Sequence, residues 1–118
     1  MPRNISFALT TQQFRDRTKT VTRRMGWRNA KAGDVLCGVV KGMGLKKGEK
    51  VERLGEIRII NIRREVLKDM ITHIAYGEAE VIAEGFPTYT PFQFVGFFAA
   101  SHKCKTDDVV TRIEFEYL

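Results

Sequence analysis

The chain contains only two cysteines, three prolines and one tryptophan among its 118 residues. It also lacks any apolar run near the roughly 20 residues that cross a bilayer, and no apolar stretch typical of a signal peptide follows its first residues. Cys37 and Cys104 suit reduced thiols, and nothing in their spacing requires a disulfide. We therefore expect one globular domain over residues 1–118, cytoplasmic and without membrane association.

Patterns typical of metal and cofactor sites are missing as well. His73 and His102 have no partners at metal-ligand spacing, and Cys104 adds only one potential ligand beside His102. No Ser-His-Asp or Cys-His arrangement is visible. The glycine-rich segment from Lys41 to Lys50 lacks the Gly-Lys-Ser/Thr ending of a P-loop. We expect no metal and no cofactor, and we interpret residues 41–50 as a mobile loop that could close over a ligand.

Positive charge is concentrated near the N-terminus. Up to Lys31 there are eight basic residues and one acid, whereas the remaining 87 residues hold 12 bases and 13 acids. The eight are Arg3, Arg15, Arg17, Lys19, Arg23, Arg24, Arg28 and Lys31. Because they lie in turns and a short strand, a membrane-surface helix is disfavoured. A nucleic acid or phosphate-bearing ligand and an ordinary solubility surface remain two open interpretations.

Hydrophobic patterning predicts five strands, over residues 4–9, 20–24, 35–40, 54–64 and 111–117. The first and last show the alternation of half-buried strands, and residues 20–22 are β-branched. In the fourth strand, Ile57 and Ile59 share one phase, while Ile60 and Ile62 share the other. This change of phase predicts a β-bulge between Ile59 and Ile60.

Helical patterns occupy most of the remaining chain. A short turn is predicted over residues 12–14, and one or two helices over 66–84, interrupted near Tyr76-Gly77 and ended by Gly85. Thr90-Pro91 is a good helix start. The face predicted to be buried on that helix comprises Phe92, Phe94, Val95, Phe98 and Ala99, and Phe97 lies off it, where it could line a pocket. The fold class is α+β: a small mixed barrel of five or six strands with two or three helices packed around it.

The segment from Lys19 to Arg24 combines ammonium, hydroxyl and guanidinium groups. In a regular strand Thr20, Thr22 and Arg24 share one face. A site that uses both Lys19 and Thr22 therefore requires the strand to begin after Lys19. From spacing alone, an exposed strand edge with polar side chains is the favoured alternative.

Three other residues are candidates for ligand contacts or chemistry. Glu84 is predicted at a helix C-terminus, where the dipole favours the acid form and suits a general acid or base. A solvated last-turn residue is the simpler interpretation. Trp27 and Tyr89 lie in turn regions, where each could stack on a base or plug a hydrophobic gap under a loop.

Taken in order, several motifs of the chain resemble the ASCH domain, a group of small proteins with a β-barrel similar to the PUA RNA-binding domain. The resemblance spans Ile5 to Phe115 and implies a single ASCH domain with a cleft that binds RNA or nucleotides. The motifs are Lys19-Thr20-Val21-Thr22-Arg23-Arg24, Ala32-Gly33-Asp34-Val35-Leu36, Glu84-Gly85-Phe86 and Val110-Thr111-Arg112-Ile113-Glu114-Phe115.

Some small bacterial ASCH proteins remove the acetyl group from N4-acetylcytidine with a lysine, a threonine and a glutamate. By motif position, the resemblance implies that Lys19, Thr22 and Glu84 correspond to them. Lys19 would act as a nucleophile if burial or nearby cations lowered its pKa. Thr22 would orient the attack or relay a proton, and Glu84 would protonate the departing nitrogen. Those members have glycine at the position of Arg17.

Our first functional expectation is a domain with a basic cleft that recognises RNA, a nucleotide or a modified nucleoside. The alternative is an amidohydrolase acting on N4-acetylcytidine or a similar base, and a weaker alternative is a ribonuclease. The sequence does not indicate an oligomeric state. The residues expected to contact the nucleic acid or ligand are Arg17, Thr20, Arg23, Arg24, Trp27, Arg28 and Tyr89.

Overall fold

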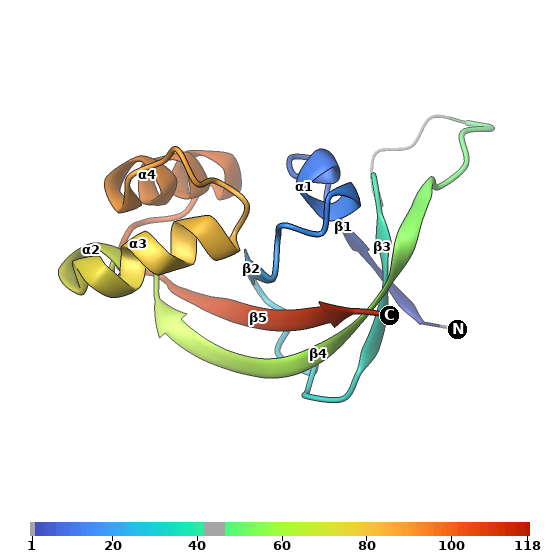
Figure 1. Cartoon of the computed structure of the whole chain (residues 1–118), viewed down its shortest axis with the longest axis horizontal. Helices are drawn as coiled ribbons and strands as arrows, with labels where there is room; N and C mark the ends of the chain where they lie inside the picture. Colours follow the sequence, from blue (N-terminus) through green and yellow to red (C-terminus); the bar gives the residue numbers. More distant parts are fainter. Residues whose placement is uncertain (1, 42–46) are drawn as a thin grey trace.

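The computed structural model describes residues 2–41 and 47–118 and contains five strands and four helices in that part of the chain (Figure 1). Residues 42–46, in the glycine-rich segment interpreted as a mobile loop, lie outside the described residues. The strands are β1 (Arg3–Ser6), β2 (Val21–Arg24), β3 (Val35–Val39), β4 (Arg53–Val66) and β5 (Val109–Tyr117). The helices are α1 (Thr11–Arg15), α2 (Asp69–Thr72), α3 (Ile74–Ala83) and α4 (Pro91–His102).

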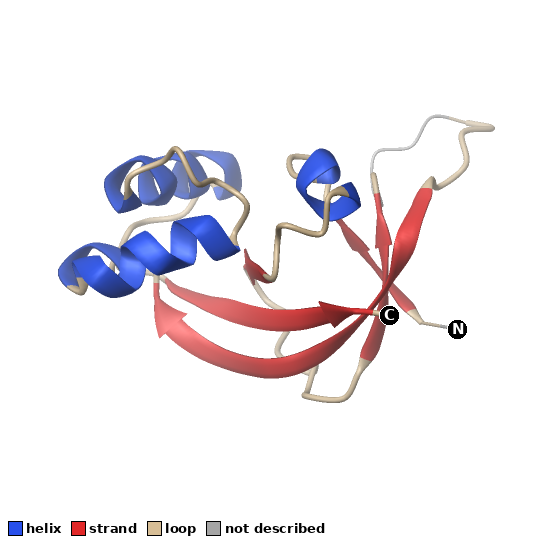
Figure 2. Cartoon of the chain, in the orientation of Figure 1, coloured by secondary structure: helices blue, strands red, loops and turns tan. Residues whose placement is uncertain are grey.

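The five strands form one curled sheet in the order β1-β3-β4-β5-β2. β1 runs parallel to β3, and the other neighbouring pairs are antiparallel. The long strands β4 and β5 bend together beneath the helices, and α2, α3 and α4 gather at one end of the sheet (Figure 2). This is a half-barrel with β1 and β2 at its edges, which confirms the predicted α+β class and the small mixed barrel-like sheet.

The predicted bulge in β4 is confirmed. The pairing of β4 with β5 shifts register between Ile59 and Asn61, so Ile60 is the extra residue. Ile57 and Ile59 are buried, whereas Ile60 is 48% exposed. An unpaired residue bends its strand and increases the local twist, which contributes to the curl of the sheet.

The first strand is shorter than predicted. Ile5 and Phe7 are buried, but Leu9 is 63% exposed, so the alternation does not continue to residue 9. The N–H of Thr10 donates to the carbonyl of Phe7, which closes a turn immediately after β1. This turn directs the chain into α1.

The helical region differs from the prediction in two places. The break lies at His73, whose φ of −117° and ψ of 78° are not helical, whereas Gly77 lies inside α3. A Cβ atom on Gly77 would lie only 1.9 Å from the carbonyl oxygen of Met70, so this glycine permits close packing of α3 on α2. On α4, Phe94 and Phe98 are buried as predicted, and the predicted cap is present.

Phe92, however, is 64% exposed, and its predicted burial is wrong. The buried residues of α4 are Pro91, Phe94, Val95 and Phe98. They follow the i, i+3, i+4, i+7 spacing of a single helix face. Phe92 falls outside that spacing.

Two hydrophobic clusters make up the core. The first lies inside the curled sheet and contains Phe7 and Phe115, and the second, containing Phe94 and Val110, lies among the helices and the neighbouring end of the sheet. Both cysteines are free thiols. No helix in residues 2–41 or 47–118 has the length and apolar character needed to cross a membrane.

Candidate functional site

A pocket of about 200 Å³ lies between the two hydrophobic clusters. Its walls come from the end of β1 and the turn that follows, from β2 and Lys19 two residues before it, from the end of α3, and from α4. The aromatic side chains on its walls are Phe7, Phe86, Phe94, Phe97 and Phe98. The polar and charged side chains are Ser6, Thr10, Lys19, Thr22, Arg23, Arg24, Glu84 and His102.

Lys19 lies in the pocket because β2 begins only at Val21, which meets the condition for a site that includes both Lys19 and Thr22. Its side chain is buried, and the residue is 2% exposed. The ammonium donates to Glu84 Oε1 at 2.7 Å and to the Glu84 carbonyl at 2.8 Å. The two residues, 65 positions apart, therefore form a buried ion pair.

Burial lowers the pKa of Lys19, because a charged ammonium is poorly solvated in the interior. The negative charge and the hydrogen bond of Glu84 oppose this effect, while Arg24 and Arg23 lower the pKa further. Arg17, which we expected to contact the ligand, does not line the pocket. Its side chain is exposed, and its guanidinium lies 5.4 Å from the ring of Tyr117.

Thr22 is buried in the same pocket and contacts Arg24. Thr22 Oγ1 accepts a hydrogen bond from Arg24 Nε at 3.0 Å. Arg24 Nη2 donates to the carbonyl of Ser6 at 2.5 Å, which connects the two edge strands of the sheet. Burial lowers the pKa of Arg24 to about 10, with Glu84 acting in the opposite direction, so this guanidinium is protonated at neutral pH.

Glu84 is 3% exposed and is not the solvated last-turn residue of the simpler interpretation. The turn at Gly85, with φ of +95°, ends α3. Gln13 links this turn to the Lys19 segment. The Gln13 side-chain amide donates to the Gly85 carbonyl at 3.1 Å, and the Gln13 backbone carbonyl accepts from the Thr18 N–H at 3.0 Å.

Behind the pocket, a row of arginines faces the polar side of α3. Arg23 on β2 lies directly opposite Arg112 on β5, which in turn lies opposite Arg63 on β4. On α3, Tyr76 and Glu80 precede Glu84 at four-residue intervals, the spacing that aligns side chains along one face of a helix. The sheet and the helix therefore present opposite charges to each other.

These groups form a buried network with Glu65 of β4. Arg23 contacts Glu84 at 3.0 Å, Glu80 at 2.5 Å and Glu65 at 2.9 Å. Arg112 contacts Glu80 at 2.5 and 3.1 Å. We call Arg23, Arg112, Glu65, Tyr76, Glu80 and Glu84 the arginine–glutamate network.

The network shifts the pKa values of its members. Burial alone would lower the pKa of Arg23, but Glu84, Glu65 and Glu80 raise it above the ordinary value. Burial alone would raise the pKa of Glu80, but the hydrogen bonds and charges of Arg112 and Arg23 lower it. The carboxylates of Glu65, Glu80 and Glu84 thus all form ion pairs with the buried Arg23 guanidinium.

Sequence reasoning missed Glu65, Tyr76, Glu80 and Arg112. The four-residue spacing of Tyr76, Glu80 and Glu84 was a usable signal, because it places two acids and a phenol on one helix face. Strand register, which brings Arg112 beside Arg23, is not readable from a single sequence.

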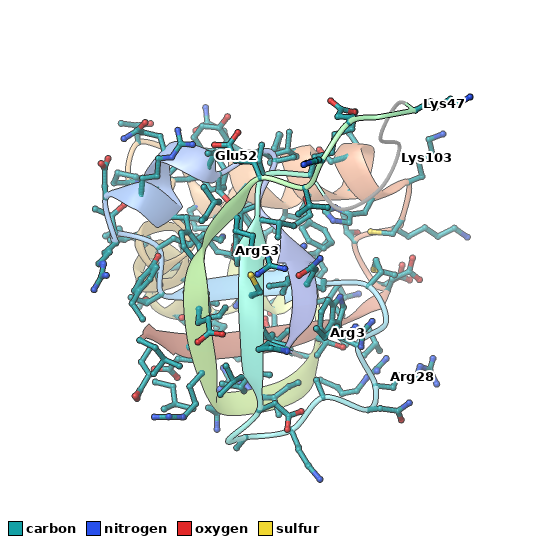
Figure 3. All side chains as sticks on the ribbon, turned by 90° about the vertical axis from the view of Figure 1, so that its right-hand side faces the viewer. Arg3, Arg28, Lys47, Glu52, Arg53 and Lys103 are labelled. Atoms are coloured by element: carbon teal, nitrogen blue, oxygen red, sulfur yellow. The ribbon has the colours of Figure 1, made fainter. Side chains whose placement is uncertain are left out.

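Several of the predicted contact residues lie away from the pocket. Thr20 is exposed, and only its backbone contributes, by pairing with Ala83 and Phe115. Trp27 packs against the first cluster and is covered by the Arg3 guanidinium, 3.9 Å from the ring centroid, so it acts as a hydrophobic plug. Arg28 is exposed and projects away from the sheet (Figure 3).

The aromatic wall includes Phe97, as the sequence suggested, and its ring centroid lies 5.5 Å from that of Phe86. Tyr89 packs against Phe86, with the ring centroids 5.0 Å apart and the rings tilted, and lines a separate groove with Phe92. Within residues 2–41 and 47–118, no three His, Cys, Asp or Glu side chains gather to hold a metal ion.

No protein-family model matches the sequence, and no curated protein matches it. Solved structures that share its fold include two crystal structures. Hypothetical protein PH0355 aligns with a TM-score of 0.64 and 14% identity over 99% of this chain and 97% of its own. Protein EF3133 from Enterococcus faecalis V583, of family DUF984, aligns with a TM-score of 0.68 and 18% identity over 100% of this chain and 77% of its own. At these identities the similarity shows the fold alone.

Proposed function

We propose that this protein is an ASCH-type hydrolase that binds a base bearing an acyl group on its exocyclic nitrogen and cleaves that amide, with N4-acetylcytidine as the model substrate. The observation that carries the proposal is the buried Lys19–Glu84 pair, at 2.7 Å, inside a pocket that also contains Thr22. A buried lysine with a lowered pKa beside a charged partner is a physical signature of a functional site.

The dimensions and walls of the pocket suit a single flat ring. A cavity of roughly 150 Å³ accommodates benzene, and this pocket has about 200 Å³. Phe86 and Phe97 provide apolar surface for stacking. Arg23 is engaged by three glutamates, so it is not available to grip a phosphate of RNA. These features favour a base-sized ligand over a long stretch of backbone.

The chemistry begins with a proton shift within the ion pair. Transfer from the Lys19 ammonium to the Glu84 carboxylate leaves a neutral amine and a carboxylic acid. An acyl-lysine would be an amide as stable as the substrate, so we assign Lys19 the role of base rather than that of nucleophile. It removes a proton from the attacking group, either water or the Thr22 hydroxyl, as that group adds to the carbonyl carbon.

Glu84 completes the reaction by donating its proton to the departing exocyclic nitrogen. The nucleobase leaves with its exocyclic nitrogen as a neutral amine. The acyl group becomes a carboxylic acid, either directly or after water hydrolyses a Thr22 ester. Water is the only co-reactant. Each proton taken up by Lys19 or released by Glu84 is restored at the end of the cycle.

The test is acetate release from N4-acetylcytidine by the purified protein, followed by mass spectrometry. We expect Lys19→Met, Thr22→Val and Glu84→Gln each to reduce kcat by at least about 100-fold, the usual scale for general acid–base groups. Thr20→Val is the matched control, because Thr20 lies two residues from Thr22 but is exposed. It should retain full activity. Wild-type protein that is folded and releases no acetate would refute the proposal.

A domain that recognises a nucleoside without cleaving it is the second candidate. The direct contact between Lys19 and Glu84 favours it, because a carboxylate at this distance stabilises the protonated, unreactive lysine. Under this alternative, calorimetry would detect N4-acetylcytidine binding without product. Exposed basic side chains such as Arg3 and Arg28 would add salt-dependent affinity for RNA (Figure 3). Degradation of that RNA without added metal would instead indicate a ribonuclease.

A further inference from the structure

Thr10 is a polar residue on the pocket wall that the proposed reaction does not use. It lies in the turn after β1, where its N–H donates to the Phe7 carbonyl, and it is 7% exposed. It also occupies the N-cap position of α1, where a threonine hydroxyl usually accepts a hydrogen bond from the first turn of the helix. In the described part of the chain no such bond forms. The local fold therefore leaves the Thr10 hydroxyl without its usual partner.

The hydroxyl is not sealed in the interior. Within residues 2–41 and 47–118, no hydrogen bond joins the Thr10 side chain to the protein. In the same ranges, every side-chain nitrogen or oxygen that is fully enclosed has a hydrogen-bond partner. The Thr10 oxygen must therefore reach accessible space, and Thr10 lines the pocket. A nearly buried hydroxyl that opens onto a pocket in this way is available to a ligand.

The other hydroxyl and imidazole groups on the wall already have protein partners. Ser6 Oγ donates to a backbone carbonyl at 3.2 Å, and Thr22 Oγ1 accepts from Arg24 at 3.0 Å. His102 Nδ1 lies 3.1 Å from a backbone carbonyl. Among these groups in the described residues, Thr10 alone combines a nearly buried position with a hydroxyl that no protein group engages.

We infer that Thr10 is a specificity-determining residue that donates a hydrogen bond to the ring carbonyl oxygen, O2, of an acylated cytosine. This inference rests on the proposed amide hydrolysis and names the class of base that the pocket selects. In that reaction the exocyclic amide of the base lies against Lys19, Thr22 and Glu84. The ring then retains two hydrogen-bond acceptors, N3 beside the amide and O2 farther from it.

The physical reason is that binding gives two groups the partners they lack. A carbonyl oxygen that leaves water for a pocket with aromatic walls loses stability unless it finds a new donor. The Thr10 hydroxyl supplies that donor. Adenine, whose exocyclic nitrogen can carry the same acyl group, has a C–H where cytosine has this carbonyl. The hydroxyl therefore favours an acylated cytosine over an acylated adenine.

The experiment compares Thr10→Val with Thr11→Val, which each replace one hydroxyl by a methyl group. Thr11 is the matched control, because its hydroxyl donates to the Phe7 carbonyl at 2.8 Å and it does not line the pocket. We expect Thr10→Val to raise KM for N4-acetylcytosine about 5- to 10-fold, the scale of one lost hydrogen bond. Its kcat should stay within about 2-fold of wild type, because this contact is equally strong before and during the reaction.

Thermal unfolding separates this role from a structural one. Thr10→Val should melt no lower than wild type, since its hydroxyl supports no protein group in the described residues. Thr11→Val should melt lower and keep the KM of wild type. Thr10→Ser, which retains a hydroxyl, should have a KM within about 3-fold of wild type. An unchanged KM in folded Thr10→Val would overturn the inference. If Thr10→Val does not fold, Thr10→Ala replaces it with the same expectations.

A second substrate tests the contact with O2 itself. 4-Acetamidopyrimidine has the ring nitrogens and the acetamide of N4-acetylcytosine but a hydrogen in place of O2. Wild type and Thr10→Val should hydrolyse this analogue with kcat/KM values within about 2-fold of each other, because the interaction is absent from both pairs. A loss on the analogue as large as that on N4-acetylcytosine would refute the assigned contact and leave the proposed hydrolysis intact.

Failure of the hydrolysis is a separate result. Folded wild-type protein that releases no acetate refutes the proposed reaction, and calorimetry with N4-acetylcytosine then compares the same variants as binders. Thr10→Val should bind about 5- to 10-fold more weakly than wild type. Equal affinities, or no binding by wild type, would refute the inference.

Discussion

Glu80 offers the sharpest test of the network that supports the site. Its carboxylate accepts from Arg23 Nη2 at 2.5 Å and from Arg112 at 2.5 and 3.1 Å. In Glu80→Gln, the amide keeps one acceptor oxygen and turns an NH₂ group toward guanidinium donors. Arg23 would retain Glu65 and Glu84 as charged partners, whereas the one ion pair left to Arg112 among the described residues would be the 3.4 Å contact with Glu114.

Removal of one partner from a buried ion pair typically costs about 3 to 5 kcal/mol. Total stability of a domain this size is about 5 to 15 kcal/mol, so the loss would be a large share of it. At about 4 °C per kcal/mol, we expect the melting temperature of Glu80→Gln to fall by roughly 12 to 20 °C. Urea unfolding should show the same loss in the free energy of unfolding.

Glu78→Gln is the matched control, because Glu78 is on the same helix and carries the same charge but is exposed. Its stability should change by no more than about 0.5 kcal/mol. Equal effects of the two substitutions would refute the reasoning, because they would mean that the buried network contributes no more than a surface charge.

The pH dependence of Glu80 provides a second check. Its pKa is lowered in the folded protein, so the folded state holds this proton less tightly than the unfolded chain, whose glutamates titrate near about 4.3. The stabilisation is therefore complete above that pH and is lost as pH falls through the lower folded value. The difference in stability between wild type and Glu80→Gln should shrink over that acidic range.

Three further predictions concern the backbone at Gly85 and Arg17 and the proposed role of Lys19. Gly85→Ala should lower the melting temperature, because φ is +95° and an added Cβ would lie 2.8 Å from Gln13 Cγ. We expect a cost of about 2 kcal/mol or more, and an unchanged melting temperature would contradict the prediction. Arg17 has φ of 59°, so Arg17→Gly should be more stable in urea than Arg17→Ala by about 1 kcal/mol, and the reverse order would count against backbone strain. Because the proposed reaction uses the one proton that Lys19 and Glu84 share, kcat/KM should fall as pH rises through the lowered pKa of Lys19, along a limb below about 10.4, and full activity above that pH would contradict the proton shift.

The fold was accessible from the sequence where local patterns decide the structure. The change of phase at Ile59 and Ile60 located the bulge, and Thr90-Pro91 located the start of α4. The break at His73 was not accessible. Glycine at position 77 resembles a helix breaker in sequence, whereas its role depends on how closely α2 approaches α3.

The candidate site was only partly accessible. Spacing alone favoured an exposed edge for the Lys19 segment, but Lys19, Thr22 and Arg23 are buried because the helices pack over that edge. For Trp27 the sequence left base stacking and a hydrophobic plug both open, and tertiary packing, which covers the ring with Arg3, decides for the plug. Pairings across tens of residues, such as Arg23 with Glu65, depend on tertiary structure that no local rule supplies.

The backbone of Thr20 has a consequence for local motion. Its N–H donates to the carbonyl of Ala83 at 2.8 Å, and its carbonyl accepts from the N–H of Phe115 at 3.0 Å. One peptide segment thus joins the end of α3 to the middle of β5. The helix cannot lift from the sheet without breaking this connection, so the Thr20 and Phe115 amides should exchange with deuterium only in the slowest, globally unfolding class. The pocket between these elements would then persist as long as the protein is folded.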